Sequence, residues 1–304
     1  MCRRLQLLVS MMAAKLKYDC YAHTLVKTAF GLILNTGFLQ KEWHSMDYLA
    51  ALNAYPYFDV SHCLSVDFEN PAAEALEKIR RSFDICRHFK GISMSEKILS
   101  LMDFVHNELH FVGDHASPSA MNTEEIMKVR KTGALFCSCF ATVLTEMLLS
   151  LGVKAVRISC IPFLFDGDCH VGVMAFLSDI NKWGYFDPTF NTYFYGQKDI
   201  VLDVFEVRKL YKNRQPVAFR HITIDKQWTL IMNGEEYASY DDWYREYMLK
   251  NLFRFIVPQK SEYGYCDRDE TCYFVINPQN YKSKNEYDKI AKPDNIRYMG
   301  NVFN

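Results

Sequence analysis

The sequence of 304 residues lacks any apolar run long enough to cross a lipid bilayer as a helix. It also lacks a charge imbalance, because 35 Lys and Arg residues stand against 36 Asp and Glu residues for a formal net charge of -1. No block of like charge stands out, so we expect neither nucleic acid nor a membrane surface as a partner. No internal repeat, low-complexity stretch or flexible linker divides the chain. With 49% hydrophobic and 23% charged residues, the composition indicates a globular protein with a sizeable core.

The 10 cysteines include no C-x-x-C pair, so the usual spacing of a structural zinc site is missing. They are scattered through apolar segments of a large chain, which favours buried thiols in a reducing compartment and therefore a cytoplasmic protein. Cys266 and Cys272 could still bridge two loop ends, since they flank the short segment Asp-Arg-Asp-Glu-Thr. Residues 1–14 have the outline of a weak signal peptide, but Gln6 and Ser10 interrupt its short apolar core.

Helical patterns dominate the first half of the sequence. Residues 1–40 predict two helices, and Asn70-Pro71 predicts the start of another, because Asn caps well and Pro suits the first helical position. Ser93 or Ser95 is expected to cap the helix that follows. The capping pattern Asn122-Thr-Glu-Glu125 predicts a further short helix.

From residue 153 onward the spacing of apolar residues changes from that of helices to that of strands. Strands are predicted over 153–161, 170–176 and 183–187, two within 219–232 before a turn at Asn233-Gly234, and two more at 253–257 and 272–276. An apolar stripe at helical spacing in the last third is interpreted as core: Tyr240, Trp243, Tyr244, Tyr247, Met248 and Leu252. Helices, one central buried helix and then antiparallel strands predict an α+β fold.

The stretch Gly133-Ala-Leu-Phe-Cys137-Ser-Cys139-Phe-Ala141 leads into an apolar helix that should end before Gly152. We expect this central helix to be buried against the antiparallel sheet, with Cys137 at its N-terminus. Unpaired backbone N–H groups and the helix dipole at that end favour the thiolate, which is the nucleophilic form of cysteine. Cys137 is therefore the candidate nucleophile.

His170 and Asp187 supply a candidate base and a candidate carboxylate. His170 begins one predicted strand, and Asp187 ends the next. If the hairpin turn is centred between Ser178 and Asp179, the two residues lie directly opposite each other, with Cβ atoms about 4.5–5.5 Å apart. A carboxylate at that distance accepts a hydrogen bond from an imidazole. A thiol, a histidine and an orienting carboxylate together make an activated nucleophile.

In order and spacing these segments resemble the transglutaminase-like superfamily, the papain-related enzymes with a Cys, His, Asp triad. The nucleophile segment of that family is Cys-x-x-aromatic-Ala followed by an apolar helix and Gly, and Cys137-Ser-Cys-Phe140-Ala141 with Gly152 matches it. The strand Val153-Lys-Ala-Val-Arg157, then His170 at a strand start, and then Trp183-Gly-Tyr-Phe-Asp187-Pro188 follow in the family order. The resemblance covers about residues 95–195 and implies a papain/transglutaminase-like core.

By position, the resemblance implies that Cys137 is the nucleophile, His170 the general base and then acid, and Asp187 the residue that orients His170. The reaction would be acyl transfer or hydrolysis at the carbonyl of a peptide, protein or small-molecule substrate, through a thioester. The backbone N–H of Cys137 would donate to the oxyanion, with Asn122 or Ser119 as a second donor. No cofactor or metal is expected, since no acidic run suggests the calcium sites of animal transglutaminases.

We divide the chain into an N-terminal helical extension (1–60), the catalytic core (61–210) and a mixed α/β extension packed on the core (211–304), without a linker to fix these boundaries. The region after about residue 200 matches no family pattern and could set the substrate.

Two alternatives remain open at this point. The same fold could serve as a non-catalytic binding module, although degenerate members usually lose one triad position. A zinc-stabilised scaffold would instead need ligands from a helix start and from strands to converge: Cys137, Cys139, Cys160, Cys169 and His170. Within the enzyme hypothesis, hydrolysis and amide formation in a biosynthetic pathway use the same residues, because access of water to the thioester decides between them.

Overall fold

A computed structural model describes residues 45–55, 66–110, 118–132, 135–163, 169–223, 239–264, 273–276 and 278. All of them belong to the unit that runs from Trp43 to Asn304. The two helices predicted within residues 1–40, the turn at Asn233-Gly234 and the Cys266–Cys272 pair lie outside the described residues. The domain boundaries near residues 60 and 210 stay predictions.

A seven-stranded sheet in the order β6-β5-β4-β3-β2-β7-β9 forms the centre of the described structure, and every neighbouring pair is antiparallel. Its strands are β2 (Ala155–Ile161), β3 (His170–Leu177), β4 (Lys182–Asp187), β5 (Thr192–Tyr195), β6 (Ala218–His221), β7 (Arg254–Pro258) and β9 (Tyr273–Ile276). A separate parallel pair joins β1 (Asp67–Phe68) to β8 (Lys260–Ser261). The predicted α+β fold with an antiparallel sheet is confirmed.

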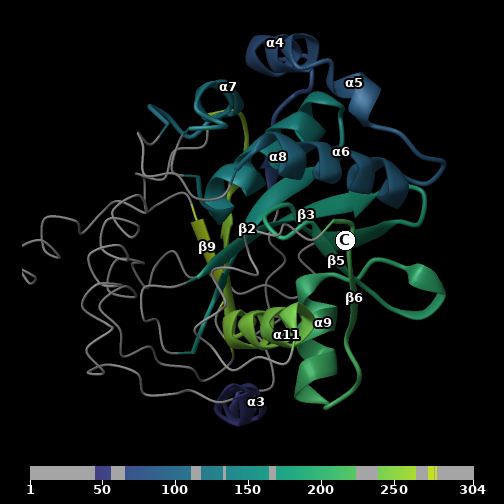
Figure 1. The fold of residues 1–304 in the computed structure, drawn as a ribbon, viewed down its shortest axis with the longest axis vertical. Coiled ribbons are helices and arrows are strands. Elements are labelled where there is room, and N and C mark those ends of the chain that lie inside the picture. The colour runs from purple at the N-terminus through teal and green to yellow at the C-terminus, as the bar shows by residue number, and fades with distance from the viewer. Residues whose placement is uncertain are drawn as a thin grey trace, which may run out of the picture. The chain divides into compact units, whose positions relative to one another are not determined.

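Helices cover both faces of this sheet, as Figure 1 shows. One face carries α4 (Glu74–Ser82), α5 (Ile85–His88), α6 (Met94–Glu108), α7 (Thr123–Lys128) and α8 (Cys137–Ser150). The other carries α3 (Ser45–Ala54), α9 (Val204–Lys212) and α11 (Tyr240–Asn251), while the short 3-10 helix η1 (Gln197–Asp199) follows β5. Within the part of the chain that the structure describes, no helix combines the length and apolar character needed to cross a membrane.

The central helix α8 is buried along its length, since every residue after Cys137 is buried. It packs on β2 and β3 and is itself covered by α4, α6 and α7. Gly152 follows its last turn at φ 75, a left-handed conformation that glycine adopts without strain. The N–H of Gly152 donates to the Leu149 carbonyl and that of Val153 to the Leu148 carbonyl, which is a Schellman end. The predicted buried helix is confirmed from its first residue to its end.

The predicted helix starts are confirmed at two of three places. Ser93 caps α6 in a capping box with Glu96, and the Asn122 side chain accepts from the Glu125 N–H at the start of α7. The start predicted at Asn70-Pro71 is wrong by three residues, because α4 begins at Glu74. The Asn70 side chain instead holds a turn by accepting from the Ala72 N–H at 2.9 Å.

The β3–β4 hairpin corrects the predicted register by two residues. Leu177 pairs with Lys182, so that Ser178 to Asn181 form a four-residue turn whose centre lies one residue later than expected. Asn181 makes this turn possible by adopting φ 51, a conformation that Asn tolerates well. Continuing the register places Asp187 opposite Gly172 and two positions from the partner of His170. Because side chains alternate between faces with a period of two, both residues still lie on one face.

Candidate active site

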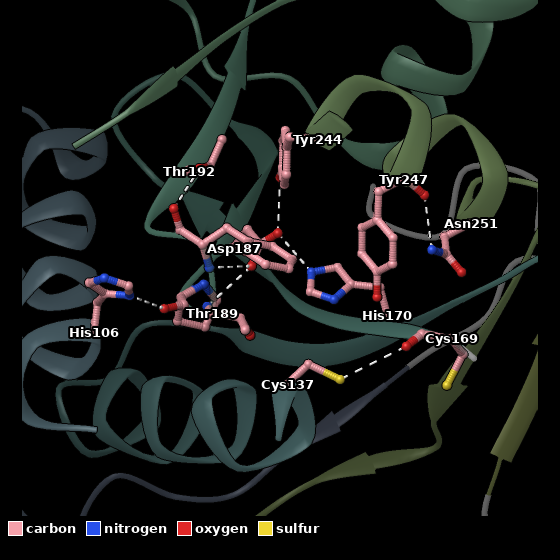
Figure 2. Close-up of polar contacts among 12 residues, drawn as sticks. His106, Cys137, Cys169, His170, Asp187, Thr189, Thr192, Tyr244, Tyr247 and Asn251 are labelled. Carbon is pink, nitrogen blue, oxygen red and sulfur yellow. Dashed lines mark hydrogen bonds and ion pairs between the residues drawn. The ribbon is translucent and has the colours of Figure 1, made fainter. Parts of the chain in front are cut away.

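Cys137 is the first residue of α8, and its side chain is half-buried. The preceding residue, Phe136, is extended and provides no side-chain cap, while its carbonyl accepts from the Cys139 N–H at 2.8 Å. Helix geometry therefore leaves the N–H groups of Cys137 and Ser138 without an acceptor inside the helix. The thiol points past the helix end to the start of β3, where Sγ lies 4.0 Å from the Cys169 carbonyl oxygen (Figure 2).

His170 and Asp187 form a hydrogen-bonded pair, with 2.7 Å between Nε2 and Oδ2. Their side chains are only 1% and 0% exposed. They share a face of the sheet with Met174 and Tyr185, which pack in the core beneath α11. The candidate nucleophile thus lies on the helix that covers one face of the sheet. The His170–Asp187 pair, called the dyad below, lies on the other face, and the thiol extends around the end of β3 that carries His170.

Four hydrogen bonds surround the Asp187 carboxylate. Oδ1 accepts from the backbone N–H groups of Thr189 at 3.1 Å and Phe190 at 3.2 Å. Oδ2 accepts from His170 and from the Tyr244 hydroxyl, which lies 2.9 Å away on α11. Figure 2 shows the carboxylate between these donors. A buried carboxylate with four donors is held in one orientation.

The surroundings of His170 favour the imidazolium. Burial by itself would lower the pKa of His170, but the charge of Asp187 and its hydrogen bond raise that pKa to about 10, and the Cys137 thiol contributes in the same direction. The second ring nitrogen, Nδ1, has no partner within hydrogen-bonding distance among the described residues and faces the side where Cys137 lies (Figure 2). The rings of Phe190 and Tyr247 pack on the imidazole, with centroids 5.1 Å and 5.4 Å away. This arrangement can take a proton from a thiol.

The other described cysteines differ from Cys137 in their environment. Cys139 is fully buried, and burial raises the pKa of its thiol to about 12. Cys160, paired with His170 across β2 and β3, is also fully buried, and burial raises the pKa of its thiol well above the usual range. Cys86 is exposed, contrary to the predicted burial, and Cys169 is half-buried. Among the described residues, no three His, Cys, Asp or Glu side chains are grouped to hold a metal ion.

Two groups near the dyad were not found from sequence. The sequence predicts Tyr244 as part of the core stripe, which its complete burial confirms, yet its hydroxyl also reaches Asp187. Tyr247, from the same stripe, packs on His170. Only the helical spacing of the stripe was visible in the sequence, and that spacing does not reveal which strand a hydroxyl meets.

The two candidates for a second oxyanion donor both lie at the start of α7. The Asn122 side-chain oxygen Oδ1 accepts from the Glu125 N–H at 2.9 Å, and the Ser119 hydroxyl donates to the Glu125 carboxylate. These contacts engage the Asn122 oxygen and the Ser119 hydroxyl in ordering α7. A role for either residue in the reaction stays a prediction.

Comparison with protein-family models and with curated proteins gives no match. Two solved structures show a distant likeness. A "putative cysteine protease" from Cytophaga hutchinsonii is 15% identical, with a TM-score of 0.32 over 51% of this chain and 55% of that one. A "putative protease" from Parabacteroides distasonis is 15% identical, with a TM-score of 0.28 over 45% of this chain and 26% of that one. The likeness spans about half of the first protein and a quarter of the second.

Proposed function

We propose that this protein is a cysteine enzyme of the transglutaminase-like kind, which acts on an amide or ester carbonyl through a thioester. The observation that carries the proposal is the buried His170–Asp187 pair at 2.7 Å, beside a half-buried thiol at the start of α8. In this proposal Cys137 is the nucleophile, His170 the base and then the acid, and Asp187 the group that orients His170.

The proposed reaction has two steps. His170 takes the thiol proton, Cys137 Sγ bonds to the carbonyl carbon, and the N–H at the start of α8 stabilises the developing oxyanion. The C–N or C–O bond then breaks as His170 returns the proton to the leaving group. Water, or an amine acceptor, next attacks the thioester while His170 takes a proton from it, which releases an acid or a new amide and restores the thiol. Neither step calls for a cofactor.

Hydrolysis and transfer differ in what reaches the thioester. The aromatic rings of Phe190 and Tyr247 beside His170 favour a small or defined acyl substrate over broad proteolysis, because they restrict the space next to the base. Peptides, proteins and small-molecule amides all remain within this proposal. Mass spectrometry of products made with and without an added primary amine would separate the two reactions.

The test is the pH dependence of iodoacetamide labelling, read for each cysteine by peptide mass spectrometry. In the wild type we expect Cys137 to label rapidly well below the ordinary thiol pKa of about 8.5. His170→Ala should abolish that advantage, and His170→Gln, which fills the site better, guards against a folding defect.

The chain carries its own controls for this test. Cys86 is an exposed reference thiol, and Cys139 is a thiol on the same helix that burial should keep slow. If Cys137 labels no faster than Cys86 at pH 6, or if His170→Gln leaves its rate unchanged, the enzyme hypothesis is wrong and a binding module on this fold becomes the better explanation.

A further inference from the structure

The hydroxyl of Tyr244 and the imidazole of His170 share one acceptor atom. Both donate to Asp187 Oδ2, at 2.9 Å and 2.7 Å, whereas the two backbone donors bind Oδ1. Tyr244 comes from α11, in the part of the sequence that the family resemblance does not cover. A third side chain therefore acts on the same carboxylate oxygen that holds the candidate base.

The ring of Tyr244 is held rigidly by other rings. It is 0% exposed, stacks on Phe194 with centroids 5.8 Å apart, and meets the edges of Phe190, Phe219 and His221 at 5.5, 5.2 and 5.3 Å. Burial, and then the charge of Asp187, raise the pKa of this phenol well above its usual range, so it remains a donor at every pH that the enzyme tolerates. A fixed, neutral O–H is a permanent dipole with its positive end on Oδ2.

A donor on a carboxylate oxygen has a definite effect on a second donor to that atom. It withdraws electron density from Oδ2 and offsets part of its negative charge. The attraction between Asp187 and a protonated His170 then becomes weaker than it would be for a bare carboxylate. In a buried site with low dielectric this effect is not screened by water.

We infer that Tyr244 is a positioning residue of the site. Its hydroxyl offsets part of the negative charge of Asp187 and so limits how tightly His170 holds its proton. The inference rests on the proposed function, because it assigns a purpose to a limit on the proton affinity of His170. A base that pairs too strongly with its carboxylate takes the thiol proton readily but is slow to return it to the leaving group. Tyr244 would keep His170 able to do both.

Several other titratable groups also face the dyad, from each element packed on it: Cys137 of α8, Cys160 of β2, Tyr185 of β4, His221 of β6 and Tyr247 of α11. Burial raises the pKa of Cys160 and Tyr185 well above the usual range, so both stay neutral between pH 5 and pH 8. Burial lowers the pKa of His221, and this neighbouring imidazole therefore needs a control.

Tyr185 supplies a matched control for Tyr244. It is also 0% exposed and on the same face of the sheet as Asp187, but its hydroxyl has no hydrogen-bond partner among the described residues. Tyr244→Phe and Tyr185→Phe each delete one buried hydroxyl, and only the first deletes a bond to Asp187. The experiment records the labelling profile of Cys137 in both variants and in the wild type, and repeats the set with His221→Gln in all three proteins.

In Tyr244→Phe we expect the acid limb of the Cys137 profile to move down by about half a pH unit, which is about three-fold faster labelling on that limb. Tyr185→Phe should match the wild type. The proton NMR signal of the His170 Nε2–H, identified by its loss in His170→Gln, should move downfield in Tyr244→Phe alone. Equal profiles for the two variants, or a shift to higher pH in Tyr244→Phe, would overturn the inference.

Failure of the proposed function gives a different result from failure of this inference. If Cys137 is slow in the wild type, the enzyme hypothesis fails, while a downfield shift confined to Tyr244→Phe would still show that Tyr244 tempers the Asp187–His170 bond. If Cys137 is fast and neither readout separates the two tyrosines, the enzyme hypothesis stands and Tyr244 is only a core residue.

Discussion

The carboxylates of Asp187 and Glu146 are equally buried, but they have different hydrogen-bond partners. Glu146 lies on α8 and is 1% exposed, and its two oxygens accept from the backbone N–H groups of Thr123 at 2.8 Å and Gly264 at 2.9 Å. Asp187 accepts from two backbone N–H groups as well, but also from His170 and Tyr244. Only Asp187 has a histidine among its hydrogen-bond partners, a group that can gain and lose a proton.

This difference separates a structural carboxylate from a candidate functional one. Glu146 ties the start of α7 and the chain after β8 to the central helix, through amides that never titrate. Burial raises the pKa of Glu146 to about 7, so the stability that its hydrogen bonds contribute depends on pH. A perturbed carboxyl pKa therefore does not identify the site here, whereas the nature of the hydrogen-bond donors does.

The sharpest test of this distinction is Asp187→Asn. The amide keeps the shape of the side chain but removes the charge that favours a protonated His170, so Cys137 should label like an ordinary thiol. At pH 6.5 the labelling rate of Cys137 should then fall about 100-fold. Glu146→Gln is the matched control, since it neutralises the other buried carboxylate. Equal losses of labelling rate in the two variants would contradict the distinction between Asp187 and Glu146.

Glu146→Gln should instead change how stability depends on pH. The folded pKa of about 7 lies above the ordinary value of 4.5, so the native state binds more protons between those values and the wild type loses stability as pH rises through that range. Relative to Glu146→Gln, which cannot titrate there, the wild type should lose on the order of 3 kcal/mol of unfolding free energy between pH 4 and pH 8. Urea unfolding at several pH values measures this, and a constant difference between the two proteins would contradict it.

The third comparison is between a glycine near Asp187 and a glycine near Glu146, and it is expected to give the smallest difference in stability. A Cβ on Gly172 would lie 2.4 Å from ring atoms of the fully buried Tyr185, so Gly172→Ala should cost about 1–3 kcal/mol by overpacking. Gly264 has φ 72, and among the described residues, its chain neighbours aside, no atom lies within 4 Å of such a Cβ, so Gly264→Ala should cost only about 1 kcal/mol of backbone strain. Thermal unfolding of both variants measures the two losses of stability, and a larger loss in Gly264→Ala than in Gly172→Ala would contradict the prediction.

The parts of the site that could be predicted from sequence are those set by local pattern. Cys137 at a helix start and Gly152 beyond its end follow from helical spacing and from the conformational freedom of glycine, and the structure confirms both. The His170–Asp187 contact was predicted from a register that is wrong by two residues. It is nevertheless made at 2.7 Å, because an error of two leaves each side chain on its face.

The remaining features depend on contacts between distant segments, which local pattern does not encode. The Tyr244 hydroxyl meets Asp187 across 57 residues of sequence. Helix α4 starts at Glu74 and not at the predicted Asn70-Pro71, because a turn held by the Asn70 side chain competes with the helix for the same N–H groups. Helix α9, with its capping box at Asp203, was not predicted, although Asp203 and Glu206 have the spacing of that motif.

The four-residue turn between β3 and β4 also constrains how this protein can change over evolutionary time. Residues inserted or deleted among Ser178 to Asn181 can be absorbed by the loop, and the pairing of β3 with β4 then stays as it is. A slip of the pairing by one residue would instead turn Asp187 to the opposite face and separate it from His170. The length of this loop is therefore expected to vary more freely than the pairing of the two strands for as long as selection maintains the dyad.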